Sequence, residues 1–131
     1  MDLSAAVPSL SRQKVSRRAA EMSGRIAEDE VAAHWRAQGF EILAQRLRNQ
    51  AGEIDLIIAN SETLIFVEVK ARKSFSAAAY AVLPKQQFRL LEAAGLALAM
   101  HEDWHRPMMR FDVALVCGGA IEHIVDAIRY N

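Results

Sequence analysis

The strongest constraint on the fold is a short apolar run, residues 63–70, that carries a glutamate and a lysine near its end. β-Branched and aromatic side chains dominate the run, which predicts a strand at the centre of a sheet. A near-continuous apolar strand is usually covered on both faces, where an unpaired charge is costly. Strand side chains alternate, so Glu68 and Lys70 point to the same face, about 7 Å apart. The presence of this charged pair on a covered strand therefore indicates that it binds a metal ion or a substrate.

A second predicted strand, residues 53–59, precedes this run across the polar turn at 60–62, and it carries Asp55. A hairpin loop of three residues places Asp55 opposite Val67, whereas a loop of four places it opposite Glu68. Only the second register brings the two carboxylates together, as hard oxygen ligands for Mg²⁺. On spacing alone, a solvent-exposed strand face with a surface ion pair fits the pattern equally well.

The rest of the chain supplies helices and strands around this hairpin. Before the hairpin, we expect a helix over residues 12–38 that could be interrupted near Gly24, a strand over 40–46 and a turn over 49–52. After it, we expect a polar and basic loop over 71–75, a helix over 86–100 with Pro84 near its first turn, and strands over 110–117 and 120–126. This order predicts an α/β domain with a mixed, mainly antiparallel sheet of about five strands and flanking helices. Residues 1–19 are expected to be a flexible arm or helix extension, and 20–131 a single domain.

Composition places the chain among globular proteins. Its 131 residues, 52% of them hydrophobic, suffice for one domain with a core. Sixteen basic residues balance sixteen acidic ones, so no global basic excess marks a nucleic-acid binder, although basic residues cluster within 12–18 and 70–89. Cys117 is the only cysteine, which excludes an intrachain disulfide and a thiolate metal cage and favours a cytoplasmic location. We expect neither a signal peptide nor a membrane span.

Four sequence blocks occur in a characteristic order. They are Gly24-Arg25-Ile26-Ala27-Glu28, Gly52-Glu53-Ile54-Asp55-Leu56, Phe66-Val67-Glu68-Val69-Lys70 and Arg110-Phe111-Asp112-Val113. An aspartate followed by Glu-x-Lys across a hairpin resembles the PD-(D/E)xK nuclease superfamily. The ordered blocks resemble, more narrowly, the YraN-type family of predicted endonucleases, which is similar to archaeal Holliday-junction resolvases. The resemblance covers residues 24–127.

This resemblance implies a restriction-endonuclease-like fold and hydrolysis of phosphodiester bonds with Mg²⁺ or Mn²⁺. It implies Asp55 and Glu68 as metal ligands, Lys70 as the catalytic lysine, and Glu28 as a helix-borne acid that reaches the metal through water or a second ion. Glu53 is expected on the opposite strand face from Asp55, in a structural or outer-shell role. The implied partner is nucleic acid, with DNA favoured over RNA and branched DNA among the candidates, and a homodimer is the analogous assembly.

Basic side chains at the start of the second helix suit phosphate contacts. Lys85, Gln86 and Arg89 lie there, and Arg72 follows the central strand, so these four are our candidate nucleic-acid-binding residues. A solvated helix face explains the helical three equally well. Asp112 is expected to tie its strand to the sheet rather than to take part in catalysis.

Two other functions compete with a nuclease. The first is a non-catalytic nucleic-acid-binding module on the same scaffold. The second is a zinc peptidase, because His101-Glu102-Asp103-Trp104-His105 matches H-E-x-x-H, in which two histidines one helical turn apart bind zinc. That motif needs a continuing helix, but Pro107 follows and the apolar periodicity ends by Met100, which predicts a helix end instead.

Overall fold

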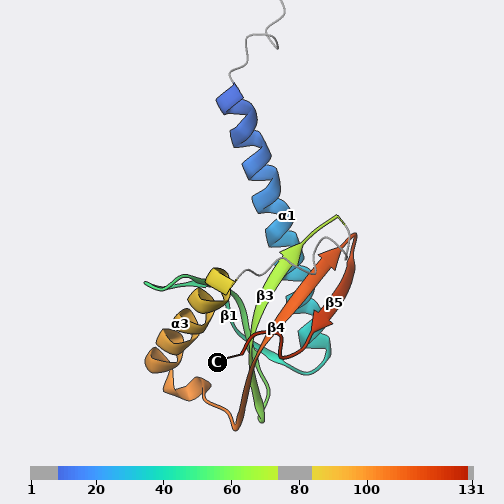
Figure 1. Cartoon of the computed structure of the whole chain (residues 1–131). Helices are drawn as coiled ribbons and strands as arrows, with labels where there is room; N and C mark the ends of the chain where they lie inside the picture. The colour runs from blue at the N-terminus through green and yellow to red at the C-terminus, as the bar shows by residue number, and fades with distance from the viewer. Residues whose placement is uncertain (1–8, 74–83, 130–131) are drawn as a thin grey trace, which may run out of the picture.

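The computed structural model describes residues 9–73 and 84–129, and it shows one sheet with a helix on each side (Figure 1). Its elements are α1 (Ser9–Ala37), β1 (Glu41–Arg48), β2 (Glu53–Ala59), β3 (Thr63–Ala71), α3 (Pro84–Met100), the 3₁₀ helix η2 (Glu102–Trp104), β4 (Met108–Cys117) and β5 (Ala120–Ile124). The mixed five-stranded sheet with two flanking helices confirms the predicted fold class. Residues 74–75 of the predicted loop and 1–8 of the predicted arm lie outside the described residues.

The strand predicted as the centre of the sheet, β3, is the central strand in the order β1-β2-β3-β4-β5. It pairs antiparallel with β2 and parallel with β4, while β1–β2 and β4–β5 are antiparallel. The parallel pair requires a crossover connection, and α3 belongs to it. A central strand with partners on both sides holds its side chains in fixed positions, which suits a functional site.

Two apolar clusters, one on each face of the sheet, build the core. Phe66 lies fully buried in the cluster under α3, stacked on Phe111 with ring centroids 5.1 Å apart. Val67 points to the other face, where Val31 and Trp35 of α1 cover it. Truncating a buried phenylalanine such as Phe66 to alanine costs about 3 to 5 kcal/mol. The alternating side chains of β3 thus anchor both helices.

α1 runs without a break through Gly24, so the structure does not contain the interruption that the sequence allows there. One glycine costs a helix interior only about 1 kcal/mol relative to alanine, which the packed C-terminal half of the helix offsets. Among the side chains of α1 that the structure describes, Ala27 is the first buried one, and the helix before it projects away from the sheet (Figure 1). Residues 9–19 therefore belong to this projecting helix.

Within the described residues, no helix is both long enough and apolar enough to span a bilayer.

Candidate metal centre and adjoining cleft

The carboxyl groups of Asp55 and Glu68 lie together at the end of the β2–β3 hairpin. Leu56 pairs with Val67, so the same register places Asp55 opposite Glu68, the four-residue-loop alternative left open by the sequence. The charge of Asp55 acts on Glu68, and Oδ2 of Asp55 accepts a hydrogen bond from the backbone N–H of Val69 at 2.9 Å. The pair is thus fixed by β3 rather than loosely exposed.

Glu28 reaches the same site from α1. It is the only buried glutamate among the described residues, at 6% exposure, and the charge of Asp55 acts on it. Nε of Arg46, on β1, lies 3.2 Å from Glu28 Oε2. The geometry of this ion pair is not that of a hydrogen bond, and Oε2 has no hydrogen-bond partner in the described structure. A buried carboxylate oxygen without a donor is suited to a cation.

Glu53 also joins this site, which corrects our expectation that it points away from Asp55. Carboxylate oxygens of Glu28, Glu53 and Asp55 all lie within 4.8 Å of one another. The expectation misapplied the strand alternation, because residues i and i+2 point to the same face and Glu53 precedes Asp55 by two. Arg46, opposite Asp55 in the β1–β2 pairing, has φ of 55°, and its Nε lies 3.7 Å from Glu53 Oε1.

Burial and mutual repulsion make these acids hold protons more tightly than usual. Burial, followed by the charge of Asp55, raises the pKa of Glu28 to about 7. The same two causes raise the pKa of Glu68 to about 8, and burial also raises the pKa of Asp55. Acidic groups that cannot all ionise together favour a bound divalent cation, whose charge removes the repulsion. The donor set, all carboxylate oxygen, matches Mg²⁺ or Mn²⁺.

Lys70 stands beside the acids, as the alternation of β3 predicted. Its Nζ lies 3.3 Å from Glu68 Oε1, and both side chains are mostly but not fully buried. Leu64 and Phe66, on the same strand face, pack under α3, so Glu68 and Lys70 point to the α3 side of the sheet. This position puts an ammonium group at the edge of the acidic cluster.

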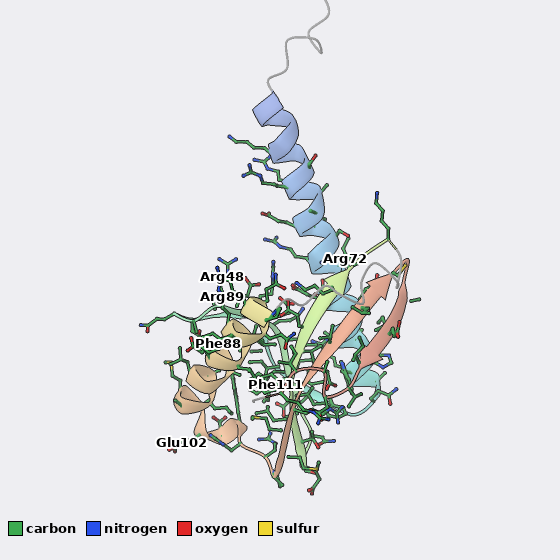
Figure 2. All side chains as sticks on the ribbon, viewed as in Figure 1. Arg48, Arg72, Phe88, Arg89, Glu102 and Phe111 are labelled. Atoms are coloured by element: carbon green, nitrogen blue, oxygen red, sulfur yellow. The ribbon has the colours of Figure 1, made fainter. Side chains whose placement is uncertain are left out.

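An open cleft of about 190 Å³ connects these residues to the start of α3. Its lining consists of Gly52, Glu53, Glu68, Lys70, Gln86, Arg89 and Leu90. Two of the four candidate nucleic-acid-binding residues, Gln86 and Arg89, thus face the cleft together with the catalytic candidates. Arg89 is labelled at the start of α3 in Figure 2. The cleft therefore has an acidic wall on the sheet and a basic residue on the helix.

The turn between β1 and β2 holds α3 in this position. Nδ2 of Asn49 donates a hydrogen bond of 2.9 Å to the carbonyl of Ala93, in the middle of α3. A Cβ at Gly52 would lie 3.9 Å from Cβ of Arg89, so turn and helix approach within contact distance. The predicted turn at 49–52 is confirmed, and its asparagine sets the width of the cleft.

The other two candidate binding residues lie outside this cleft. Lys85 is exposed on the first turn of α3. Arg72 is exposed after β3, donates to the carbonyl of Ala71, and lines a separate cavity between α1 and the ends of β3 and β4. Their role in nucleic-acid binding stays a prediction.

The H-E-x-x-H segment does not form the helix that a zinc site of that type needs. α3 ends at Met100, and His101 has the non-helical angles φ −131° and ψ 78° before η2. Its ring stacks on Trp104 at 3.7 Å, while the ring of His105 lies 3.4 Å from the carbonyl oxygen of Leu98. The two histidine side chains therefore pack at the C-terminal end of α3.

Asp112 is fully buried and structural, as expected. Its carboxylate accepts hydrogen bonds from Arg110 at 3.0 Å and from the backbone N–H of Asp126 at 2.9 Å. It ties β4 to the segment after β5.

Sequence comparison places the chain among known proteins. The model of the uncharacterised protein family UPF0102 matches residues 27–116. The chain belongs to this family. A UPF0102 protein of Acidiphilium cryptum is 50% identical over 118 residues, which cover 90% of this chain and 92% of that protein. UPF0102 proteins of Azorhizobium caulinodans and Bradyrhizobium diazoefficiens are 43% and 42% identical, covering 86% and 83% of this chain and 87% and 83% of their own lengths.

UPF0102 membership confirms the YraN-type family expected from the sequence blocks. The matched segment contains Glu28, Asp55, Glu68 and Lys70, so all four candidate catalytic residues lie within the family region. The names of the family and of these relatives give no activity. Sequence analysis did not identify Arg46, because its contact with two acids depends on a left-handed backbone conformation that no motif indicates.

Proposed function

We propose that this chain is a metal-dependent nuclease that hydrolyses phosphodiester bonds, with branched DNA among its candidate substrates. One observation carries the proposal: acids from α1, β2 and β3 meet beside Lys70, with carboxylate oxygens of Glu28, Glu53 and Asp55 within 4.8 Å of one another and Glu68 opposite Asp55. A cluster of this many negatively charged groups is costly unless a cation binds to it. The resemblance to the PD-(D/E)xK superfamily supports the same conclusion from the sequence.

Asp55 is the central ligand in the proposed metal site, because it is close to both groups of acids. Glu28 and Glu53 offer oxygens on one side of it, and Glu68 on the other. A bound Mg²⁺ or Mn²⁺ would supply charge to offset that of the phosphate and would lower the pKa of a bound water. Mg²⁺ usually takes only one or two carboxylates, so some of these acids would act through water or on a second ion.

Lys70 would orient the attacking water and offset negative charge on the phosphate. Its contact with Glu68, at 3.3 Å, holds the ammonium at the cleft rather than in bulk solvent. Preorganised charge in a partly buried site stabilises a transition state without reorganisation at the moment of reaction. Arg89, on the opposite wall of the cleft, would bind a substrate phosphate.

The test is a labelled panel of single-stranded, duplex, flap and four-way-junction DNA with matched RNA, incubated with Mg²⁺ or Mn²⁺. Wild type is compared with Glu68→Gln, which keeps the size of the side chain and removes its charge, and with the exposed-residue control Glu92→Gln. Cutting that needs metal, is lost in Glu68→Gln and is retained in Glu92→Gln supports the nuclease and identifies its substrate. Tight binding without cutting by any of the three favours the binding module instead.

A further inference from the structure

The projecting half of α1 carries its positive charge on one side. Lys14, Arg18, Glu21, Arg25 and Glu28 follow one another at steps of four, three, four and three residues. Residues three and four apart are neighbours on a helix surface, so these five form a single stripe. Arg17 precedes Glu21 by four residues and therefore borders the same stripe. Every basic residue between 14 and 28 thus lies on the helix side that ends at the metal centre.

All four of these cations are exposed and available to a partner. No ion pair joins Lys14, Arg17, Arg18 or Arg25 to a carboxylate in the part of the chain that the structure describes. In Figure 2, nitrogen-tipped side chains of the projecting helix gather on the side toward Arg48 and Arg89. Between residues 14 and 25 these four cations oppose one acid of the stripe, Glu21, and Glu28 follows only at its end, so this surface would be basic although the whole chain is neutral.

We propose that this stripe, defined by Lys14, Arg17, Arg18 and Arg25, binds the phosphate backbone of a nucleic-acid duplex whose scissile phosphate lies at the Glu28 end. The inference rests on the proposed nuclease function and adds the path of the substrate. From Lys14 to Glu28 the helix rises about 21 Å, which corresponds to about six base pairs of duplex. Because the family model matches only from Ala27, the stripe lies outside the region that it describes.

Charge complementarity favours phosphate over other occupants of this surface. A row of cations spaced by one helical turn has no apolar centre, whereas a stable protein interface does. The exposed apolar residues of the same helix segment, Met22 and Ile26, are offset from the stripe. Contacts of this kind would be independent of base sequence and strongly dependent on salt.

The test is the affinity of a fluorescein-labelled 20-base-pair DNA duplex, measured by anisotropy in EDTA at several salt concentrations. Arg17→Gln/Arg18→Gln is compared with Arg36→Gln/Arg129→Gln, two exposed arginines outside residues 14–28, of which Arg129 is ion-paired to Asp126. Loss of two phosphate contacts should weaken binding of the duplex at least about tenfold. It should also flatten, by about 2, the slope of the logarithm of the association constant against the logarithm of the salt concentration. The control pair should do neither, and Glu21→Gln should bind more tightly than wild type. Circular dichroism verifies that each variant keeps its helix, since glutamine and arginine have similar helix propensity.

Cleavage by wild type, measured in parallel with Mn²⁺, separates the two claims. If wild type cuts and the Arg17→Gln/Arg18→Gln variant binds with wild-type affinity and salt slope, the stripe proposal is overturned and the nuclease stands. If wild type binds but does not cut, and the variant binds weakly, the stripe is supported and the nuclease is overturned. A wild type that neither binds nor cuts overturns both.

Discussion

Asp55 and Glu68 face each other across the β2–β3 hairpin, although both are acids. Burial and the charge of Asp55 raise the pKa of Glu68 to about 8. Near neutral pH the metal-free site therefore favours a protonated Glu68 where the proposed cofactor would bind. Binding of metal and release of protons are consequently coupled at this site, and the predictions below follow from that coupling.

Neutralising Asp55 should remove stabilisation by metal. We expect Mn²⁺ at a hundred times its Kd to stabilise wild type by about 2.7 kcal/mol, and Asp55→Asn to gain little or nothing. Thermal unfolding with and without Mn²⁺ measures this, with Glu92→Gln on the exposed face of α3 as the control. Equal stabilisation of Asp55→Asn and wild type would place the metal elsewhere.

The stability of the metal-free protein should decrease as pH rises. The folded state raises the pKa of Glu28 to about 7 and that of Glu68 to about 8, above the usual values of the unfolded chain. Folding thus binds protons, so this contribution is fully present below about pH 4.5 and is lost as pH rises to about 8. Unfolding curves in EDTA should show the decrease, and Glu28→Gln/Glu68→Gln should reduce it. A wild type and a double variant with the same pH dependence would contradict the raised pKa values.

Metal affinity should show the opposite pH dependence. Ligand carboxyls must lose their protons before they coordinate, so Mn²⁺ should bind about tenfold more tightly at pH 8 than at pH 6.5. Isothermal titration calorimetry in buffers of different ionisation enthalpy would detect the released protons. An affinity that is constant over this range would mean that no protonated acid takes part.

Lys70→Met should slow cutting about 10²- to 10³-fold while binding persists. The substitution keeps the apolar stem and removes the ammonium 3.3 Å from Glu68. Loss of one preorganised charge at a transition state costs about 10²- to 10³-fold in rate. Single-turnover cleavage measures this loss, and Mn²⁺ titration tests whether the metal site is intact. A variant that cuts at the wild-type rate would exclude Lys70 from the reaction.

Arg89 and Lys85 offer a matched comparison on one helix. Arg89 lines the cleft, whereas Lys85 does not. Arg89→Gln should weaken nucleic-acid binding and flatten its salt slope by about 1, with a smaller effect for Lys85→Gln. Anisotropy titrations of both variants at several salt concentrations provide the measurement. The reverse order would show that the cleft is not the path of the backbone.

Arg46→Gln should make the fold depend on metal. Arg46 lies within ion-pair distance of both Glu28 and Glu53, whereas Arg48 pairs with Glu53 and not with Glu28 among the described residues, so Arg46 is the arginine that the two acids share in the metal-free protein. Because the pair is only partly buried, its loss should cost about 1 to 2 kcal/mol in EDTA. Mn²⁺ should restore more stability to Arg46→Gln than it adds to wild type. An unchanged unfolding temperature in EDTA would show that Arg46 contributes nothing there.

The sheet was predictable because its central strands have a pattern that only a buried strand satisfies. The bounds predicted for β2 match the structure, and those for β3 are short by one residue. The hairpin register was not predictable, because loops of three and four residues fit the sequence equally well. Asn60 decides it: its Oδ1 accepts the N–H groups of Glu62 and Thr63 at 2.9 and 2.8 Å, which forms the four-residue turn.

The acidic site was predictable in part. Alternation on β3 correctly placed Glu68 beside Lys70, since that strand is regular. The same rule places Glu53, two residues before Asp55, on the face of Asp55, so the prediction that Glu53 points away misapplied the rule, and the structure corrects it. Arg46 could not be predicted, because it adopts a left-handed conformation that a non-glycine residue rarely takes and local periodicity carries no information about such a residue.

The most direct test of the central claim is single-turnover cleavage of a four-way junction and of a linear duplex by wild type and Asp55→Asn, at pH 8 with Mn²⁺. We predict that wild type cuts at least one of the two substrates, that EDTA stops the reaction, and that Asp55→Asn leaves the substrate intact while still binding it. Cutting by Asp55→Asn at the wild-type rate, or cutting by wild type in EDTA, would contradict a metal-dependent reaction at this site.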